Sequence, residues 1–308
     1  MAAEAISRRK TFIMAARVPF STASVLPALL GGVWGWVYAG QQFNWLHASI
    51  AVMGVLFLQL GANTINDYYD WEMSDKINRF PTPFSGGSRS RLEKVLPRKS
   101  FLHMSIVFFA LAFLSAGVLM YLDRVLVLAV GTAGALCGFL YSARPISLQS
   151  RGLGEIAIFL AFGPLITLGM GYAACEMWKP EFLLIGIPNG FIVTNILWIN
   201  EFPDFEADNK SGKRNLVVRL GTSRARYGYV MLFGLFYLSV ILLSIIGVYP
   251  LWSLAVLLTV PFVAKHARHM WKNHANPLTI VPSQAGTIQM QILTSVLIII
   301  SFIVDKYI

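Results

Sequence analysis

The stretch WLHASIAVMGVLFLQLGANTINDYYD, residues 45–70, combines the two features that decide the fold of this chain. Its first part, residues 45–66, is an apolar run that does not alternate between apolar and polar positions as a barrel strand does. About 20 such residues span the hydrocarbon core of a bilayer as a helix. The run therefore predicts a transmembrane helix, and the acidic residues after it mark where that helix leaves the membrane.

The composition of the whole chain extends this interpretation. Of the 308 residues, 56% are hydrophobic and only 13% are charged, against roughly 25% charged in a typical soluble domain. So little polar surface excludes a soluble globular protein of this size, and the hydrophobicity excludes a disordered one. We expect an all-α, polytopic membrane bundle that forms a single domain over residues 1–308, with a short basic lead-in at residues 1–17.

Further apolar runs bring the number of predicted transmembrane spans to about nine. Each is expected to be a helix, because lipid requires every backbone polar group to be hydrogen-bonded internally. Gly134 and Gly138, four positions apart in the fourth run, are typical of a close-packing helix face. The predicted spans are residues 18–39, 45–66, 101–122, 125–143, 152–175, 182–200, 227–248, 249–264 and 285–304.

The basic residues divide unequally between the two sides that these spans define. All of the 25 Lys and Arg residues except Arg124, Lys179 and Lys306 fall in the lead-in or in the loops after the second, fourth, sixth and eighth spans. By the positive-inside rule, the N-terminus and these loops are cytoplasmic and the C-terminus lies outside. The net charge of +10 is thereby assigned to membrane topology, and no nucleic-acid partner is expected.

Eight of the 15 acidic residues lie in two short windows on the predicted cytoplasmic side, after the second and sixth spans. Residues three or four positions apart share one face of a helix, so each window presents a polar stripe. The stripes are Asn63, Asn66, Asp67 and Asp70 in the first window, and Asn200, Asp204 and Asp208 in the second.

These two stripes have the chemistry of a magnesium site. Carboxylates at such spacing repel one another, so a cation is expected to hold them. Asp and Asn oxygens without His or Cys are hard ligands, which suit Mg²⁺. Because Mg²⁺ takes one or two carboxylates and completes its shell with phosphate and water, we predict that two or more Mg²⁺ ions bridge the stripes to a diphosphate.

Basic residues follow each acidic window, and they suit a diphosphate as well. Arg guanidinium groups match phosphate oxygens, and the segment Gly86–Ser88 offers backbone N–H groups for an anion. The candidates in the two trailing segments are Lys76, Arg79, Arg89, Lys213 and Arg214.

The same residues resemble the motifs of the UbiA superfamily of intramembrane prenyltransferases. Asn66, Asp67 and Asp70 resemble its NDxxD-type motif, and Asp204 with Asp208 resembles its DxxxD motif. Within the superfamily the chain is similar to the menaquinone branch, which prenylates 1,4-dihydroxy-2-naphthoate. The other similar segments are Tyr141–Pro145, Gly152–Glu155, Phe162–Pro164, Lys213–Leu216 and Arg219–Gly221.

The resemblance implies Mg²⁺-dependent transfer of a polyprenyl group from an allylic prenyl diphosphate to an aromatic acceptor, with 1,4-dihydroxy-2-naphthoate expected, in lipid-quinone biosynthesis. Asp70, Asp204 and Asp208 would act through the metal. Arg17 and Arg79 would join the other basic residues on the diphosphate leaving group. The ring of Tyr141 would face the prenyl cation, and the isoprenoid tail would leave between helices into membrane lipid.

Three residues near these motifs depart from the pattern or have an open role. Asp75 lies one position beyond the place where many members have a third acid, and Glu201 replaces an Asn. Glu155 either caps the fifth span or acts on the acceptor.

Three alternatives stay open. Prenyl transfer to a non-aromatic lipid acceptor, such as geranylgeranylglycerol phosphate in archaeal-type lipid synthesis, would share the metal motifs. A cation-coupled transporter would also use carboxylates, but transporter sites lie near the bilayer midplane, and these carboxylates lie at predicted helix ends. A non-catalytic lipid-binding subunit would tolerate loss of Asp70. The length of the prenyl chain depends on the depth of its tunnel.

Overall fold

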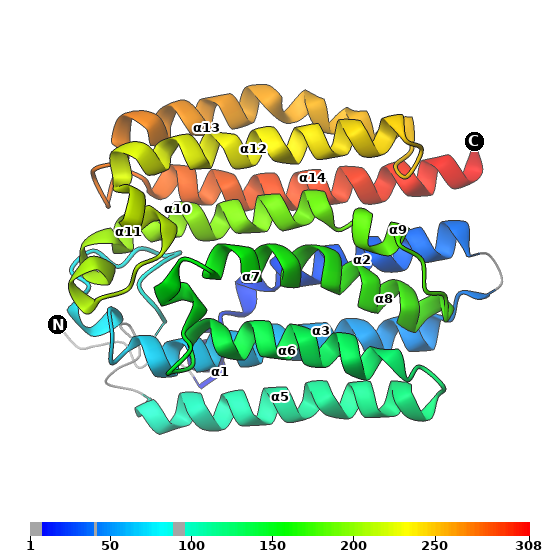
Figure 1. The fold of residues 1–308 in the computed structure, drawn as a ribbon, viewed down its shortest axis with the longest axis horizontal. Helices are drawn as coiled ribbons and strands as arrows, with labels where there is room; N and C mark the ends of the chain where they lie inside the picture. Colours follow the sequence, from blue (N-terminus) through cyan, green and yellow to red (C-terminus); the bar gives the residue numbers. More distant parts are fainter. Residues whose placement is uncertain (1–7, 40–41, 89–95) are drawn as a thin grey trace.

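The computed structural model describes residues 8–39, 42–88 and 96–308, and in it long helices lie side by side as a bundle (Figure 1). These three ranges contain helices, turns and loops and no strand. Seven helical segments within them are long and apolar enough to cross a membrane. The predicted all-α membrane bundle is therefore confirmed.

The seven segments correspond to the first, second, third, fifth, sixth, seventh and ninth predicted spans. They are Val18–Tyr38 (η1, Val18–Ser21, and α2, Thr22–Tyr38), Trp45–Asp70 (α3), Arg98–Tyr121 (α5), Gly154–Cys175 (α7, Gly154–Leu160; η5, Ala161–Leu165; α8, Ile166–Cys175), Glu181–Ser211 (α9, Glu181–Leu184, and α10, Ile187–Ser211), Thr222–Ile245 (α12) and Val281–Tyr307 (α14).

The fourth and eighth predicted spans have a different form. The fourth corresponds to α6 (Leu126–Ser142), which is apolar but shorter than the seven. The eighth consists of 3₁₀ turns (η6, Leu251–Thr259) that continue into α13 (Val260–Asn273), so this helical segment passes the predicted end at residue 264. Polar residues occupy one face of α13, so a search for continuous apolar runs does not detect its second half, beyond residue 264. The number nine thus stays a prediction.

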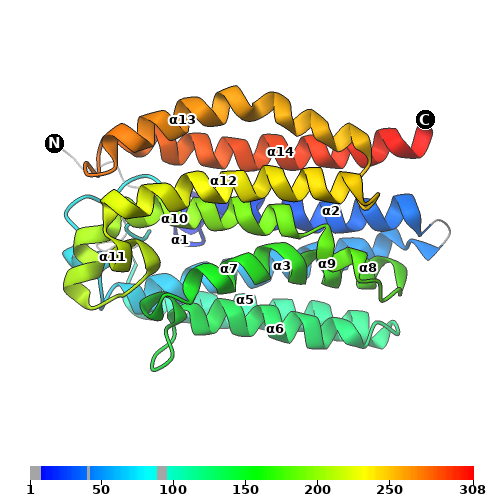
Figure 2. The ribbon, with the colours of Figure 1, turned by 45° about the horizontal axis from the view of Figure 1, so that its top comes forward.

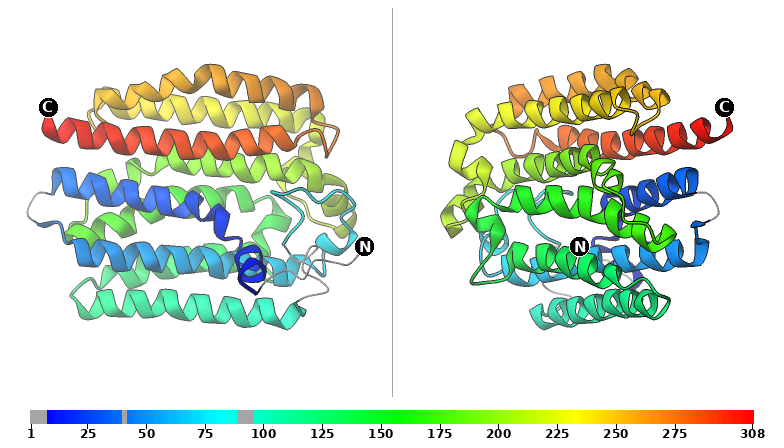
Figure 3. Two further views of the ribbon diagram at one scale, coloured as in Figure 1. Left: turned by 180° about the vertical axis from the view of Figure 1, so that it is seen from behind. Right: turned by 45° about the vertical axis from the view of Figure 1, so that its right-hand side comes forward.

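Two ends of the bundle can be distinguished. α11 (Leu216–Leu220) and residues 71–88, which follow α3, lie at one end, together with the C-terminal ends of α3 and α10 (Figure 1). The C-terminal end of α14 lies at the opposite end, which the view from behind also shows (Figure 3). α12, α13 and α14 run alongside one another on one side of the bundle (Figure 2). The acidic ends of α3 and α10 are thereby brought to the same place.

Glycines allow the helices around the site to approach closely. A Cβ added at Gly163, in the π-helical turn η5, would lie 2.8 Å from the Cα of Gly190 on α10, which is closer than real Cβ atoms come. A Cβ at Gly138 would lie 2.9 Å from the Cβ of Ala62, so α6 packs tightly on α3 there. The close-packing face predicted for α6 is present at Gly138. At Gly134 the packing is looser, because an added Cβ would lie 3.8 Å from Cδ1 of Leu58, an ordinary van der Waals distance.

One face of α14 is buried and polar. Gln284, Thr287 and Gln291 are fully buried inside the bundle. The hydroxyl of Thr287 pairs with that of Tyr229 on α12 at 2.7 Å, and Gln291 donates to the backbone carbonyl of Thr22 on α2 at 3.3 Å. Buried polar groups need such partners in an apolar surrounding, so α14 is held in register against several helices.

Candidate active site

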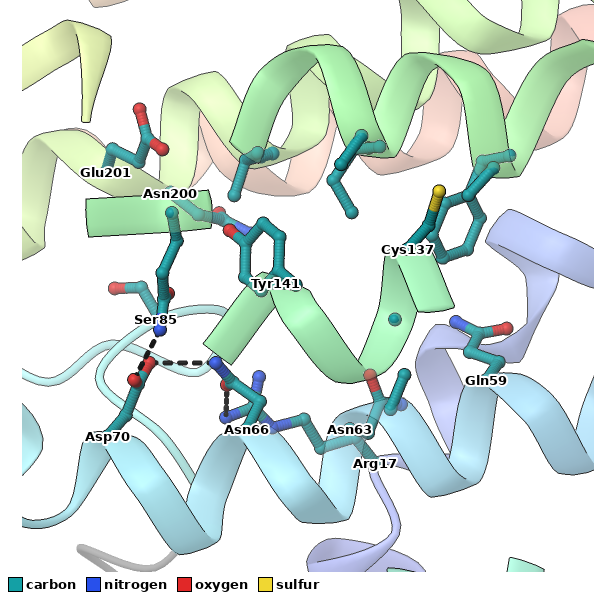
Figure 4. A pocket seen from close by; sticks show the side chains of 18 of the residues that line it. Arg17, Gln59, Asn63, Asn66, Asp70, Ser85, Cys137, Tyr141, Asn200 and Glu201 are labelled. Atoms are coloured by element: carbon teal, nitrogen blue, oxygen red, sulfur yellow. Dashed lines mark hydrogen bonds between the residues drawn. The ribbon is translucent and has the colours of Figure 1, made fainter. Parts of the chain in front are cut away.

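A cavity lies where α3 and α10 end, and Figure 4 shows side chains that line it. Its outer part is polar, with Asp70 on α3 and Glu201 on α10. Its inner part, toward Cys137, is mainly apolar. The predicted site residues that line this cavity are Arg17, Asn63, Asn66, Asp70, Tyr141, Asn200, Asp204, Asp208 and Lys213.

The polar stripe of α3 is tied to Arg17. The side-chain amide of Asn66 donates to Asp70 at 2.8 Å, as their spacing of four residues predicts. Arg17 donates to the amide oxygen of Asn66 at 3.3 Å and forms an ion pair with Asp67. Burial lowers the pKa of Arg17, but the charges of Asp67 and Asp75 outweigh it and raise the pKa overall. Asp67 is fully buried and does not line the cavity.

Lys213 joins the two stripes. Its Nζ lies 2.9 Å from Oδ2 of Asp70 and 3.4 Å from Oδ1 of Asp208. Gln149 donates to the other oxygen of Asp70 at 2.6 Å. All four residues are buried. Burial lowers the pKa of Lys213, but the charges of Asp208 and Asp70 raise it above its ordinary value, so the ammonium stays charged.

The carboxylates of α10 are held by residues from loops. Asp204 accepts hydrogen bonds from the side chain of Asn78 at 2.7 Å and from the backbone N–H of Gly86 at 3.1 Å. Asp208 accepts one from Asn215 at 2.9 Å. The loop after α3 therefore closes directly on the second stripe.

The two remaining stripe residues are oriented by partners outside the stripes. The amide nitrogen of Asn63 donates to the backbone carbonyl of Ala16 at 3.3 Å. The amide oxygen of Asn200 accepts from Gln284 on α14 at 2.9 Å. A carbonyl oxygen has two lone pairs, so Asn200 retains one for a cation.

Tyr141 occupies the middle of the cavity. Its ring projects from the last turn of α6 between the acidic end and the inner apolar end (Figure 4). A Cβ added at Gly154 would lie 3.0 Å from Cε2 of this ring. The small residue at the start of α7 thus gives the ring its room.

The oxygen donors of the site fit a hard divalent cation. In the described part of the site, Oδ2 of Asp75 and Oε2 of Glu201 are buried carboxylate oxygens without a hydrogen-bond donor, and Oδ1 of Asp208 faces the ammonium of Lys213 at 3.4 Å. Burial and the nearby charge of Asp70 raise the pKa of Asp75 well above its ordinary value. Within the described residues, no three His, Cys, Asp or Glu side chains form a ready-made metal cage. Mg²⁺ does not need one, because phosphate oxygens and water complete its shell.

Three predicted diphosphate ligands among the described residues are not brought into the cavity. Lys76, Arg79 and Arg214 are exposed, and none of them lines it. Arg89 lies outside the described residues. Gly86 and Ser88 donate their backbone N–H groups to Asp204 and Asp67, so these groups bind carboxylates rather than form the predicted anion site. Arg17 and Lys213 are the predicted cations that line the cavity.

Several contacts of the site were not predicted from the sequence. Glu155 accepts a hydrogen bond from the backbone N–H of Leu216 at 2.7 Å, so it ties the start of α7 to the first turn of α11, and it does not line the cavity. The other residues that hold the stripes without having been predicted are Asn78, Ser142, Gln149, Asn215 and Gln284. Asn215 and Ser142 lie within segments that carried the resemblance, but Gln284 lies one residue before the ninth predicted span, in a segment that gave no signal.

The chain matches a known protein family. The sequence model of the UbiA prenyltransferase family matches residues 24–280. The chain belongs to the UbiA prenyltransferase family. This confirms the resemblance drawn from the acidic motifs, and as a UbiA protein the chain can be compared with named relatives over almost its whole length.

Three relatives illustrate the comparison. The 1,4-dihydroxy-2-naphthoate octaprenyltransferase of Escherichia coli is 26% identical, over 100% of this chain and 99% of that protein. The enzyme of the same name from Bacillus subtilis is 23% identical, over 93% and 90%. The 2-carboxy-1,4-naphthoquinone phytyltransferase of Arabidopsis thaliana is 25% identical, over 88% of this chain and 71% of that protein.

Solved structures of UbiA homologues share the fold. One from Aeropyrum pernix superposes with a TM-score of 0.70 over 94% of this chain and 98% of that chain, at 16% identity. One from Archaeoglobus fulgidus, bound to DMAPP and Mg²⁺, gives a TM-score of 0.67 over 94% and 99%, also at 16% identity. At such identity the likeness concerns the fold alone.

Proposed function

We propose that this UbiA protein transfers a polyprenyl group from an allylic prenyl diphosphate to 1,4-dihydroxy-2-naphthoate, and that the reaction depends on Mg²⁺. The observation that carries the proposal is that Lys213 bridges Asp70 and Asp208 at the polar end of a cavity whose other end is apolar. A molecule with a charged diphosphate and a hydrocarbon tail has the same two-part character. The named relatives favour the naphthoate as the acceptor.

The metal would be held by the two stripes. The proposed ligands are Asn63, Asn66, Asp67, Asp70, Asn200, Asp204 and Asp208, which would take two or more Mg²⁺ ions together with the diphosphate. Bound Mg²⁺ supplies charge neutralisation on the diphosphate oxygens. Asp67 is the least direct of these ligands, because Arg17 and Ser88 already occupy its oxygens.

The side chains of the protein stabilise the departing diphosphate. As the bond between C1 and oxygen of the donor breaks, its electron pair stays with the diphosphate, and the added negative charge develops near Lys213 and Arg17. Fixed cations in a site with little water stabilise such charge strongly. Lys76, Arg79, Arg89 and Arg214 would approach the diphosphate only if their loops moved inward, and we propose this secondary role for them.

The prenyl carbon that loses the diphosphate is positive and must be kept from water. Tyr141 presents a ring face in the middle of the cavity, where cation–π attraction stabilises it. A ring carbon of the acceptor then forms a bond to C1. Departure of a proton, or of the carboxyl group as CO₂, restores the aromatic ring of the acceptor.

The orientation in the membrane follows the same proposal. With nine crossings, the acidic end of the bundle and the N-terminus face the cytoplasm, where a water-soluble diphosphate product can leave. The C-terminus then faces the outside. Accessibility labelling of single cysteines in sealed vesicles, at positions 210 and 305, tests this assignment.

The decisive experiment measures prenyl transfer by purified protein in detergent. Labelled geranylgeranyl diphosphate and Mg²⁺ are supplied with dihydroxynaphthoate in one tube and geranylgeranylglycerol phosphate in another. Metal-dependent product with the naphthoate is expected. Product with the glycerol phosphate alone would leave the donor site intact and overturn the aromatic acceptor. Transfer that persists after chelation would overturn the role of the metal.

A further inference from the structure

A group of basic residues lies where α12 begins and α13 ends, on one side of the bundle (Figure 2). Residues 209–304 contain nine Lys and Arg and no Asp or Glu. Among the nine, Arg226 lies near the start of α12, and Arg268 and Lys272 lie one turn apart near the end of α13. None of these three pairs with a carboxylate of the described residues. We call the three residues the α12–α13 basic patch.

The guanidinium of Arg226 is held between the two helices by aromatic rings. Its Cζ lies 4.4 Å from the ring centre of Trp271 on α13 and 5.6 Å from that of Tyr227 on α12. The two rings themselves pack edge to face, with their centres 4.8 Å apart. The Nε of Arg226 is buried and has no hydrogen-bond partner in the described part of the chain. A stacked guanidinium keeps the N–H groups along its edge for the oxygens of a phosphate.

The two cations of α13 extend this charge along the surface. Arg268 and Lys272 are both exposed. Residues three or four positions apart share one face of a helix, so Arg268 shares a face of α13 with both Trp271 and Lys272. The positive charge of α13 therefore lies beside the ring on which Arg226 stacks.

An exposed apolar stripe of α12 leads away from the patch. It consists of Tyr227, Met231, Gly234, Leu238 and Leu242, spaced three or four residues apart, and its four side chains are exposed. A Cβ added at Gly234 would meet no heavy atom within 4 Å, so the surface is open there. Because α12 is long and apolar enough to cross a membrane, this stripe faces acyl chains. Aromatic residues at the end of a span lie at the level of lipid headgroups, which places Tyr227 and the basic patch at that level.

We propose that the α12–α13 basic patch binds an anionic phospholipid, with the phosphate at Arg226, Arg268 and Lys272 and the acyl chains along the stripe of α12. Unpaired positive charge beside an exposed apolar surface complements a molecule with a negative headgroup and hydrocarbon chains, and basic sites between membrane helices bind such headgroups. A soluble anion would use only the charged part. The patch does not line the cavity at the ends of α3 and α10, so this site is separate from the one proposed for the diphosphate.

The test counts the phospholipids bound to the purified chain by native mass spectrometry. The protein in detergent is titrated with dioleoylphosphatidylglycerol or with dioleoylphosphatidylcholine, which has the same acyl chains and no net charge. The double variant Arg268→Gln/Lys272→Gln should weaken binding of the first phosphatidylglycerol roughly 25-fold, and addition of Arg226→Gln roughly 100-fold, since each basic residue near an anionic lipid contributes about fivefold. Binding of phosphatidylcholine should not change.

The matched control removes three other positive charges at the same end of the bundle. Lys99, Arg144 and Lys210 are exposed and lie at the start of α5, after α6 and near the end of α10. The triple variant Lys99→Gln/Arg144→Gln/Lys210→Gln has the same change in net charge as the triple variant of the patch. It should bind phosphatidylglycerol as the wild type does. Thermal unfolding in detergent checks that every variant is folded, and the double variant changes only exposed side chains.

Three outcomes would overturn the proposal. Equal weakening in the patch variants and in the control would mean that net charge alone attracts the lipid. Equal affinity of the wild type for the two phospholipids would exclude recognition of the headgroup charge. Displacement of bound phosphatidylglycerol by an excess of inorganic phosphate would assign the patch to a soluble anion. No prenyl donor or acceptor is present in these measurements, so their result is independent of the test of prenyl transfer.

Discussion

The ammonium of Lys213 lies 2.9 Å from Asp70 and links the end of α3 to the end of α10 through Asp208. Two helices separated by more than 100 residues of sequence thus share one buried cation. The lysine compensates part of the negative charge of the site before substrate binds. From the same position it can pair with the negative charge of a bound diphosphate.

Replacing Lys213 with Met should therefore impair both folding and catalysis. Removing one partner of a buried ion pair leaves uncompensated charge and costs about 3–5 kcal/mol, so the free energy of unfolding should fall by that order. Mg²⁺ should restore more of the lost stability in the variant than it adds to the wild type, because it replaces the missing positive charge. Thermal unfolding in detergent with and without Mg²⁺ measures both effects.

Lys210→Met is the control for this experiment. Lys210 pairs with Glu206 on the exposed side of α10, where ion pairs contribute little. Stability and transfer should both match the wild type. Equal losses in the two lysine variants would contradict a special role for Lys213.

Asp204→Asn should raise the Mg²⁺ concentration needed for half-maximal transfer and lower kcat by about 10²–10³-fold, the scale seen when a group that stabilises developing charge is removed. Asn78 and Gly86 donate to different oxygens of Asp204, so the amide oxygen of the variant keeps one of these two hydrogen bonds, and thermal unfolding checks that the variant is folded. Transfer is titrated with Mg²⁺. Glu206→Gln, an exposed change two residues away, is the comparison, and an unchanged Mg²⁺ curve for Asp204→Asn would exclude Asp204 as a ligand.

The acidic stripes could be predicted because they lie on helices, where a spacing of three or four residues fixes which side chains share a face. The same argument fails for loops. Nothing in the sequence distinguishes Lys213, which is buried between carboxylates, from Arg214, which is exposed. Loop direction depends on the backbone path, which has no repeating period.

The length of the helical segments shows a second limit. Hydropathy located the apolar runs, but α13 continues through polar residues to Asn273 because its other face packs against α14. The contact between Gln284 and Asn200 could not be predicted either, since a polar residue at the edge of an apolar run gives no indication of its partner.

That contact gives a prediction for a residue far from the motifs. Gln284→Leu removes the donor that orients the oxygen of Asn200, and outer-shell partners of metal ligands typically contribute 10–100-fold to metal affinity or activity. We expect a loss of at least tenfold in kcat/KM with a raised Mg²⁺ requirement. Gln291→Leu, on the same buried face of α14 but bonded to Thr22, is the control for stability. If both variants lose activity in proportion to stability, Gln284 has only a structural role.

Tyr141 allows the role of its ring to be separated from that of its hydroxyl. Tyr141→Phe keeps the ring in the middle of the cavity and should retain most of kcat, because cation–π attraction depends on the ring face. Tyr141→Leu keeps apolar bulk without the ring, and its kcat should fall about thirtyfold, corresponding to roughly 2 kcal/mol for a desolvated cation–π contact. The measurement is single-turnover transfer, together with the fraction of donor hydrolysed rather than transferred. If Phe and Leu behave alike, the ring does not stabilise the prenyl cation, and if Phe alone abolishes transfer, the hydroxyl is the group that matters.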